Sequence, residues 1–345
     1  MVEIDTLYPE ACKILQAASK EDLTVKSIKH GGSGRQIIRI SLNPEAVRLI
    51  PSELDEQTPP TNLESIIGMI YSVDKAENLH FAPQADWLNQ EGINAPHVYN
   101  HNAELGYALV EDLGSDDLYA KKDADWLDVR KPLYLKAIDN INALHLLSPT
   151  EELPLEPEFD TELYLWEQNY FFSFYLGQYL GLQHSHKEEL QELKENETLH
   201  RMASKLGNLK KSLIHRDFQS QNIMVKDDDT YIVDFQGMRL GRPEYDFASL
   251  IYDPYMDLSE EEIAELKEHA SAISDAPEEH FDIMLTQCAI QRLMQALGAF
   301  AKLTAQGYTH FERYIPAALR SLRTLAEQHL NIPELNQFLA IEKED

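Results

Sequence analysis

The chain has 345 residues, of which 43% are hydrophobic and 26% are charged, as in soluble globular proteins with one large domain or two lobes. Its 59 acidic and 30 basic residues give a formal net charge of -29. This balance argues against a surface that binds nucleic acid or an anionic membrane, because polyanions would be repelled.

The sequence predicts a cytoplasmic protein. The N-terminal residues carry acidic side chains and lack the apolar stretch of a signal peptide, and no run approaches the 18 apolar residues of a membrane-spanning helix. Cys12 and Cys288 lie far apart without metal-ligand spacing, and we interpret both as ordinary thiols.

The N-terminal part of the chain is predicted to be rich in strands. Thr6–Ser19 has the apolar spacing of a helix, whereas Leu23–Lys29 and Gln36–Leu42 alternate like strands joined by the glycine-rich sequence HGGSGR. The proline-rich and acidic residues 43–62 then predict an exposed insertion.

The same part continues with a strand at Ser65–Tyr71 and a helix at Lys75–Gln90. Short strands are expected at His97–Tyr99 and Tyr107–Glu111. The pattern changes after this point, so we place the boundary between two lobes near Leu113.

Beyond the boundary the pattern is mostly helical, which predicts an α+β protein with lobes at residues 1–112 and 113–345. The expected helices are Trp126–Leu147, Asp160–Leu182, Glu188–Leu209, Asp246–Tyr252, Ser259–Ile273, Glu278–Thr304 and Tyr314–Leu330.

The segment LIHRDFQSQNIMVKDDDTYIVDFQG interrupts the helices and carries the main chemical signal. Asp217 is followed by Asn222 five positions later and by Asp234 at the end of a predicted hairpin. Its strands are expected at 222–225 and 231–234, with the turn at KDDDT. An exposed turn could explain one of the three side chains, but not all three at this spacing.

These residue types suit phosphoryl transfer from a magnesium–nucleotide complex. Asp217 would accept the hydrogen bond and later the proton of an acceptor hydroxyl. Asn222 and Asp234 would bind Mg²⁺ through oxygen atoms, the ligands that this ion prefers. His215 and Arg216 are expected to brace the loop.

The glycine-rich sequence is a candidate site for nucleotide phosphates. Backbone N–H groups of Gly31, Gly32 and Gly34 can approach phosphate oxygens closely because no Cβ intervenes, and Ser33 adds a hydroxyl donor. A purely structural turn is the alternative interpretation.

A strand lysine that binds phosphates and pairs with a helix glutamate is expected in this chemistry. The corresponding strand has no lysine, and Met69 stands at the expected site. Glu77 is the candidate glutamate, with Lys75 or Arg48 as a possible substitute cation. A solvent-exposed helix face explains Glu77 equally well.

YALVEDLG is predicted to contact adenine, because it is an apolar strand that ends in a turn containing glycine. Glu111 and Leu113 would use their backbone groups, and Leu109 would face the pocket. A plain strand end is the alternative.

Further candidates concern the catalytic loop and the acceptor. Asp246 is expected to be the N-cap of its helix and to accept hydrogen bonds from the loop backbone. Gln219, Glu167 and Asp253 are candidate acceptor-binding residues, although Glu167 lies in a helix that is expected to be mostly core. Surface placement is an equal alternative for Asp253.

At HRDFQSQN, VDFQGM and YDFASLIYD the sequence resembles the aminoglycoside phosphotransferase and choline kinase superfamily, which has a protein-kinase-like fold. More narrowly, it is similar to bacterial kinases of N-acetylmuramate and N-acetylglucosamine, also at FDTELYLWE and AIQRLMQALGAF. The resemblance implies ATP and Mg²⁺ as cofactors, Asp217 as the base, and Asn222 and Asp234 as metal ligands.

The resemblance also implies phosphorylation of an anomeric hydroxyl during the recycling of peptidoglycan amino sugars. Two alternatives stay open. One is an aminoglycoside-, choline- or homoserine-type phosphotransferase, and the other is a catalytically weak nucleotide-binding regulator that lacks the strand lysine.

Overall fold

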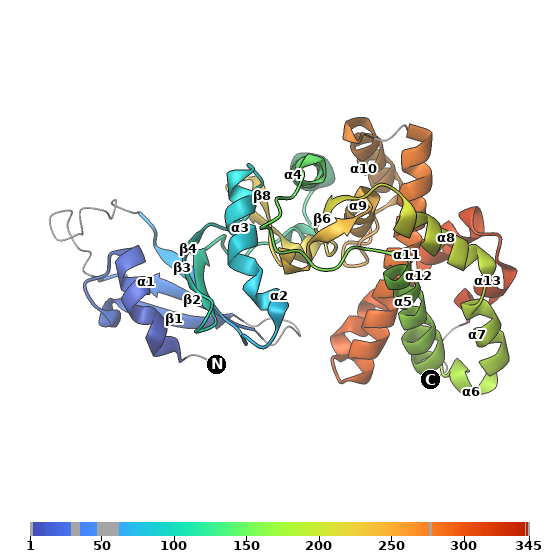
Figure 1. Cartoon of the computed structure of the whole chain (residues 1–345), viewed down its shortest axis with the longest axis horizontal. Coiled ribbons are helices and arrows are strands. Elements are labelled where there is room, and N and C mark those ends of the chain that lie inside the picture. Colours follow the sequence, from blue (N-terminus) through green and yellow to red (C-terminus); the bar gives the residue numbers. More distant parts are fainter. Residues whose placement is uncertain (1–2, 29–34, 47–61, 276–277, 342, 344–345) are drawn as a thin grey trace. The chain divides into compact units, whose positions relative to one another are not determined.

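In a computed structural model, the chain is described at residues 3–28, 35–46, 62–275, 278–341 and 343 (Figure 1). The predicted phosphate-binding residues Gly31, Gly32, Ser33 and Gly34, and most of the expected insertion, lie outside these ranges.

The chain forms two compact units. The first consists of Met1–Ser115, Thr150–Pro154 and Tyr231–Gln236. The second consists of Asp116–Pro149, Leu155–Thr230 and Gly237–Asp345.

The first unit contains an antiparallel sheet of five strands in the order β1-β2-β3-β5-β4. The alternation of apolar residues predicted these strands within one or two residues at most ends. Their bounds are β1 Leu23–Ile28, β2 Gln36–Leu42, β3 Ser65–Ile70, β4 Val98–Asn102 and β5 Tyr107–Glu111.

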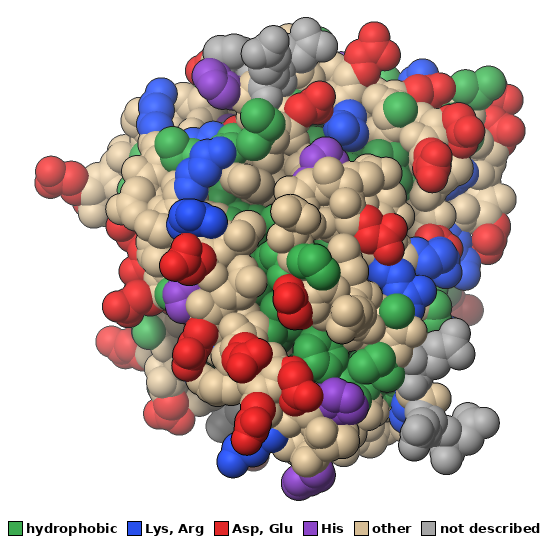
Figure 2. Space-filling model, turned by 90° about the vertical axis from the view of Figure 1, so that its right-hand side faces the viewer, with side chains coloured by type: hydrophobic (Ala, Val, Ile, Leu, Met, Phe, Trp, Pro, Cys, Tyr) green, Lys and Arg blue, Asp and Glu red, His purple; other side chains and the backbone are tan. Residues whose placement is uncertain are grey.

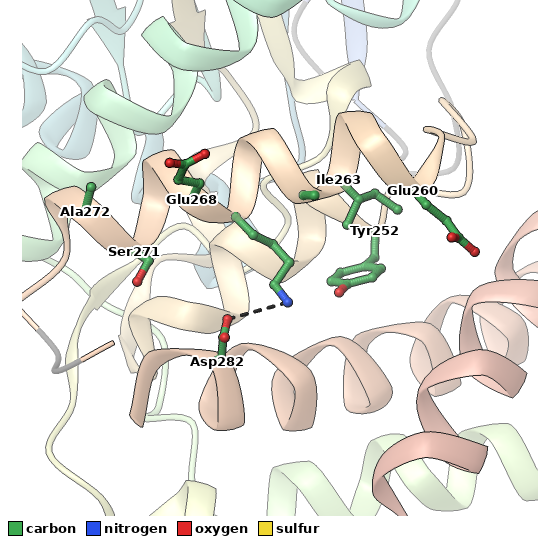
Figure 3. Close-up of a pocket in the computed structure, with 9 residues that line it drawn as sticks. Tyr252, Glu260, Ile263, Glu268, Ser271, Ala272 and Asp282 are labelled. Atoms are coloured by element: carbon green, nitrogen blue, oxygen red, sulfur yellow. Dashed lines mark ion pairs between the residues drawn. The ribbon is translucent and has the colours of Figure 1, made fainter. Parts of the chain in front are cut away.

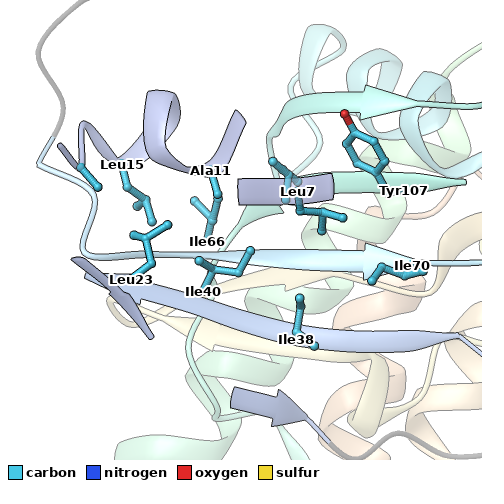
Figure 4. Close-up of a cluster of buried hydrophobic side chains, with 11 residues drawn as sticks. Leu7, Ala11, Leu15, Leu23, Ile38, Ile40, Ile66, Ile70 and Tyr107 are labelled. Carbon is cyan, nitrogen blue, oxygen red and sulfur yellow. The ribbon is translucent and has the colours of Figure 1, made fainter. Parts of the chain in front are cut away.

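A helix covers one face of this sheet and closes an apolar core (Figure 4). Helix α1 (Tyr8–Leu15), which a 3₁₀ turn at Ile4–Leu7 precedes, contributes Ala11 and Leu15 to the core. Ile40 of the sheet belongs to the same core and is fully buried. Burying a leucine or isoleucine side chain of this kind contributes about 1.5–3 kcal/mol.

The helix predicted at Lys75–Gln90 is divided into α2 (Ala76–Leu79) and α3 (Phe81–Gln90). Pro83 has no N–H to donate to the carbonyl of Leu79, so the helical hydrogen-bond pattern is interrupted there. Helix α3 is anchored within the first unit by Phe81, whose ring stacks on that of Phe235 at 5.1 Å between centroids.

The second unit is mostly helical, which together with the first confirms the predicted α+β class. Its helices are α4 Lys131–Leu146, α5 Thr161–Tyr170, α6 Leu182–Ser185, α7 Lys187–Lys194, α8 Glu197–Asn208, α9 Pro243–Ile251, α10 Glu260–Ile273, α11 Glu278–Ala305, α12 Ile315–His329 and α13 Pro333–Leu339. Strands β6 (Ser212–Ile214) and β9 (Arg239–Gly241) pair antiparallel.

The predictions for Glu188–Leu209 and Asp160–Leu182 differ from the structure. The expected helix Glu188–Leu209 is wrong as a single element, because the Asn196 side chain accepts hydrogen bonds from Thr198 N and Leu199 N and starts α8 anew. The expected helix Asp160–Leu182 changes at Phe171 from α-helix into a π-helix that ends at Tyr179.

Strands β7 (Ile223–Lys226) and β8 (Asp229–Ile232) form the predicted hairpin. Its turn consists of Asp227 and Asp228, with φ of 52° and 59°. Positive φ at both turn residues characterises the type I′ turn, which matches the twist of the strands and which aspartate tolerates.

Helix α11 lies against α5, α9 and α12 within the second unit. Gly298 permits the approach to α5, since a Cβ at this position would lie 2.7 Å from the Tyr170 ring and 2.9 Å from its backbone carbonyl carbon. The sequence ALGAF therefore contains a glycine that close helix packing requires.

On the face shown in Figure 2, acidic side chains are scattered among lysines and arginines. The excess of acidic residues is therefore spread over this face. Within the described parts of the chain, no helix combines the length and the apolar character needed to cross a bilayer.

Candidate active site

The carboxylate of Asp217 lies between two arginines of the second unit. Arg216 Nη1 is 3.0 Å from Asp217 Oδ2, and Arg292 Nη1 is 3.1 Å from Asp217 Oδ1. Burial alone would raise the pKa of Asp217, but the two guanidinium groups lower it to about 2. The side chain keeps 30% of its surface exposed, so an ionised carboxylate is accessible at neutral pH.

Asp246 fixes the backbone that carries Asp217. Its Oδ2 accepts a hydrogen bond from His215 N at 2.8 Å, and its Oδ1 accepts one from Arg216 N at 2.8 Å. The expectation that this acid holds the loop is confirmed, but its expected N-cap position is wrong. Helix α9 begins at Pro243, so Asp246 lies one turn inside it.

The fixed backbone includes a conformation that few residues adopt. Arg216 has a φ of 78°, in the left-handed region that is unfavourable for a side chain with a Cβ. Such conformations persist where surrounding contacts enforce them. The bond from Arg216 N to Asp246 is one such contact.

Replacing Asp246 with alanine should lower the free energy of unfolding by about 2–4 kcal/mol, because the N–H groups of His215 and Arg216 would lose their acceptor. Urea denaturation curves of the wild type and the variant at pH 7 measure this difference. Asp246→Asn, which keeps one acceptor oxygen, should lose less stability. An unchanged denaturation midpoint for the alanine variant would contradict this role.

Asp253 also supports the loop. It is 2% exposed, and its Oδ2 accepts from Ser220 N at 2.8 Å while its Oδ1 accepts from Tyr255 N at 2.9 Å. Both carboxylate oxygens are therefore engaged with backbone groups. We assign Asp253 to positioning the loop, in place of the expected contact with an acceptor.

Asn222 lies close to Asp217 within the second unit, as the sequence predicts. Its Nδ2 donates to the backbone carbonyl of Asp217 at 2.9 Å, and its N–H donates to Gln219 O at 2.8 Å. The side-chain bond uses the amide nitrogen, so a metal ion would be bound through the amide oxygen.

Arg292 on α11 was not identified from the sequence. Besides Asp217, it contacts Gln219, whose Oε1 accepts from Arg292 Nη2 at 2.8 Å. Arg292 is only 8% exposed. The candidate acceptor residue Gln219 is therefore held beside Asp217 by the same guanidinium group.

Glu167 is a fully buried carboxyl group near this cluster. Its Oε1 accepts a hydrogen bond from the Tyr245 hydroxyl at 2.7 Å, and its Oε2 has no hydrogen-bond partner within the described residues. Burial raises the pKa of Glu167 to about 7, although Arg216 and Tyr245 act in the opposite direction.

This raised pKa predicts a stability that falls between pH 4.5 and pH 7, because the folded protein binds the Glu167 proton more tightly than the unfolded chain does. The contribution of the Glu167 proton to the free energy of unfolding is complete below the pKa of the unfolded chain. It is lost as pH rises through about 7, which lowers the free energy of unfolding by about 3 kcal/mol. Glu167→Gln should therefore be more stable than the wild type at pH 8 and similar at pH 4.5. Urea denaturation at both values tests this, and an equal difference at both would refute it.

Asp234 lies in the first unit, just after β8. It has a φ of 61°, and its side chain is 53% exposed. Arg35 Nη1 donates to Asp234 Oδ1 at 2.9 Å. Asp217 and Asn222 belong to the other unit, so a site made by all three residues is a proposal that we argue below.

Arg35 is the basic partner that the sequence did not identify for Glu77. Arg35 Nη2 lies 3.5 Å from Glu77 Oε1, whereas Lys75 or Arg48 was expected to take this place. Arg48 lies outside the described residues. Met69 is 7% exposed on β3, so an apolar side chain does occupy the position expected for the strand lysine.

The segment expected to contact adenine is held by an ion pair. Arg39 Nε and Nη2 donate to the two carboxylate oxygens of Asp112 at 2.6 and 2.9 Å, and Ser65 Oγ donates to Oδ2 at 2.6 Å. Burial would raise the pKa of Asp112, but these hydrogen bonds hold it below its usual value. The backbone around Glu111 and Leu113 is thereby fixed.

The three candidate adenine contacts differ in their surroundings. Glu111 N donates to His97 O at 2.8 Å at the end of the sheet, and Leu113 is 5% exposed. Leu109 is fully buried in the apolar core with Leu7 and Ile38. We therefore assign Leu109 to the core and remove it from the proposed nucleotide contacts.

The donor set is compatible with magnesium. Among the described residues, no group of three or more His, Cys, Asp or Glu side chains is arranged to hold a metal ion. Magnesium needs no such cage, because it is normally held by one or two carboxylates together with phosphate oxygens and water. The amide oxygen of Asn222 and the exposed carboxylate of Asp234 are each a ligand of this kind.

A separate cavity of about 740 Å³ lies in the second unit between α10 and α11 (Figure 3). Lys267 lines the cavity, and its Nζ lies 3.5 Å from Asp282 Oδ1. Tyr252, which also lines it, lies at the end of α9. Among the described residues that line it, none is a candidate site residue. The cavity is therefore distinct from the Asp217 loop.

A family model described as "Phosphotransferase enzyme family" matches residues 61–281. The N-acetylmuramate/N-acetylglucosamine kinase of Neisseria meningitidis is 28% identical over 256 residues, covering 72% of this chain and 75% of that protein. The kinase of the same name from Pseudomonas aeruginosa is 25% identical over 280 residues, covering 75% and 77%.

Solved structures have a similar fold. An aminoglycoside phosphotransferase, APH(2'')-Ib, superposes with a TM-score of 0.58 at 13% identity, covering 94% of this chain and 99% of that chain. A choline kinase from Cryptosporidium parvum has a TM-score of 0.59 at 15% identity, with coverage of 98% and 99%. At such identities the likeness concerns the fold alone, and it confirms the predicted protein-kinase-like fold.

Proposed function

This chain belongs to the phosphotransferase enzyme family and is a kinase, and from that premise we propose that it transfers the γ-phosphate of ATP to the anomeric hydroxyl of N-acetylmuramate or N-acetylglucosamine. The names of the N. meningitidis and P. aeruginosa relatives support this choice of acceptor.

The observation that carries the proposal is the loop that presents Asp217. Its backbone is held by Asp246 and Asp253, and its carboxylate by Arg216 and Arg292. Phosphoryl transfer proceeds through a loose transition state, so the base is needed mainly to orient the acceptor hydroxyl. An ionised carboxylate in a fixed position suits that task.

On this proposal the first unit binds the nucleotide. The bound Mg²⁺ would neutralise charge on the phosphates, and the chain would hold it through the Asn222 amide oxygen and the Asp234 carboxylate. The proposed nucleotide contacts are Gly31, Gly32, Ser33, Gly34, Glu111 and Leu113, with Glu77 in a supporting position.

The charges around Asp217 favour a sugar over a cationic acceptor. The net charge of -29 suggests attraction of aminoglycosides or choline, but Asp217 itself is flanked by two guanidinium groups. A cationic acceptor would meet those charges at short range, where repulsion is least screened. A neutral or anionic amino sugar avoids this cost. We propose Gln219 as an acceptor contact because Arg292 holds it beside the base.

Phosphorus NMR of the products from ATP, Mg²⁺ and single acceptors tests the proposal. The panel contains N-acetylglucosamine, N-acetylmuramate, kanamycin, choline and homoserine. We expect a sugar 1-phosphate from the N-acetylated sugars. The methyl glycoside of N-acetylglucosamine, whose anomeric oxygen is blocked, is the control and should give no product. A product from the glycoside, or only from the amines, would refute the anomeric assignment.

The alternative of a catalytically weak nucleotide-binding regulator rests on the apolar Met69 on β3. Measurement of ADP formation separates the two functions, because a regulator would bind ATP without acceptor-dependent turnover. The presence of Asp217 beside Asn222 favours the kinase, since a protein that only binds a nucleotide has no use for an acceptor-orienting carboxylate.

A further inference from the structure

Arg35 has an arrangement that structural support alone does not explain. Its guanidinium group contacts three side chains of the first unit, donating to Asn78 Oδ1 at 2.9 Å, to Asp234 Oδ1 at 2.9 Å and to Glu77 Oε1 at 3.5 Å. Its side chain is 9% exposed, whereas those of Glu77 and Asp234 are 48% and 53% exposed. A nearly buried cation is therefore paired with two accessible carboxylates.

The inner contact of Arg35 is firmly anchored. Asn78 is 2% exposed, and its Nδ2 donates to the carbonyl of Ser72 at 2.9 Å. This bond orients the Asn78 amide so that its oxygen faces Arg35 Nε. The direction of the guanidinium group is thus fixed independently of the two carboxylates.

The position of Arg35 is next to the strand from which a lysine is missing. In the sheet, Ile37 of β2 is the register partner of Met69 on β3. Arg35 precedes Ile37 by two residues, the interval that returns a strand side chain to the same face. The adjacent strand can therefore supply a cation where β3 offers a methionine.

We propose that Arg35 binds the phosphate oxygens of the nucleotide and replaces the absent strand lysine, with Asn78 and Glu77 orienting its guanidinium group. This inference rests on the proposed function, in which Asp234 binds the magnesium ion of Mg-ATP. When Asp234 faces the metal, its charge is balanced there, and Arg35 can exchange that carboxylate for phosphate. Arginine suits this role because its planar donors match two phosphate oxygens.

The test compares Arg35→Met and Arg35→Lys by calorimetric titration with adenosine, ADP and ATP in the presence of Mg²⁺. Arg35→Met should weaken ATP and ADP binding by about 10- to 100-fold, the effect of losing a charge-assisted hydrogen bond. Arg35→Lys should recover part of the loss. Adenosine has no phosphate, so its affinity should stay within about twofold of the wild type.

Lys26→Met is the matched control, because it removes a positive charge from an exposed position in the same sheet. It should leave all three affinities unchanged. Thermal denaturation of Arg35→Met and Arg35→Lys shows whether a loss of affinity comes from a folding defect.

Two failures can be told apart. If the wild type does not bind Mg-ATP at all, the proposed function fails. If the wild type binds Mg-ATP and Arg35→Met binds it equally well, only the role of Arg35 is overturned. The role of Arg35 would also be overturned if both variants lost as much affinity for adenosine as for ATP, because that outcome assigns Arg35 to structural support.

Discussion

Replacing Asp217 with asparagine should lower kcat by about 100- to 10,000-fold while the affinity for Mg-ATP stays close to that of the wild type. The amide cannot take the proton of the acceptor hydroxyl, and one of its two polar atoms is a donor. Arg216 and Arg292 both donate to the present carboxylate, so one of them would lose its acceptor. The variant should keep the conformation of the loop but lose the group that accepts the proton.

Steady-state kinetics with N-acetylglucosamine and separate titration with Mg-ATP give the two quantities. Asp139→Asn is a suitable control, because its side chain is 58% exposed in the same unit. The control should retain full activity. Wild-type kcat in Asp217→Asn would remove the assignment of this residue as the base.

Replacing Asp234 with alanine should abolish most of the magnesium dependence of ATP binding, with an affinity for Mg-ATP reduced by about 100-fold. The variant would lose the one carboxylate proposed for the metal. It would also release Arg35, which now donates to Asp234 Oδ1. Binding of ATP without Mg²⁺ should therefore not decrease.

Titration with ATP, with and without Mg²⁺, separates these effects. Asp86→Ala removes an exposed carboxylate from α3 in the same unit and should behave as the wild type does. The ligand role of Asp234 would be ruled out by an unchanged response of its alanine variant to Mg²⁺.

The sequence predicted elements well where local pattern determines them. Strand β2 was predicted at its observed bounds, because apolar alternation over seven residues is a strong signal. The prediction of one helix at 188–209 was wrong, because the Asn196 side chain caps a new helix within a continuous amphipathic pattern. Strands β6 and β9 have three residues each, too few for alternation to show.

The site was predictable to the extent that its residues lie in one motif. Asp217 and Asn222 are five positions apart, and the structure brings them together. Arg35 and Asp234 are separated by 199 positions, and Arg292 and Asp217 by 75. Such pairs depend on the tertiary fold, so no local pattern identifies the partner of either carboxylate.

The central claim is that Asp217, Asn222 and Asp234 act on one magnesium–nucleotide complex beside an acceptor hydroxyl. A crystal structure with Mg²⁺, a non-hydrolysable ATP analogue and N-acetylglucosamine tests it directly. We expect oxygens of Asn222 and Asp234 at about 2.0–2.1 Å from one Mg²⁺ ion, and the Asp217 carboxylate at about 3 Å from the anomeric oxygen. A structure in which Asp217 and Asp234 face different cavities, or in which the metal contacts neither Asn222 nor Asp234, would contradict the claim.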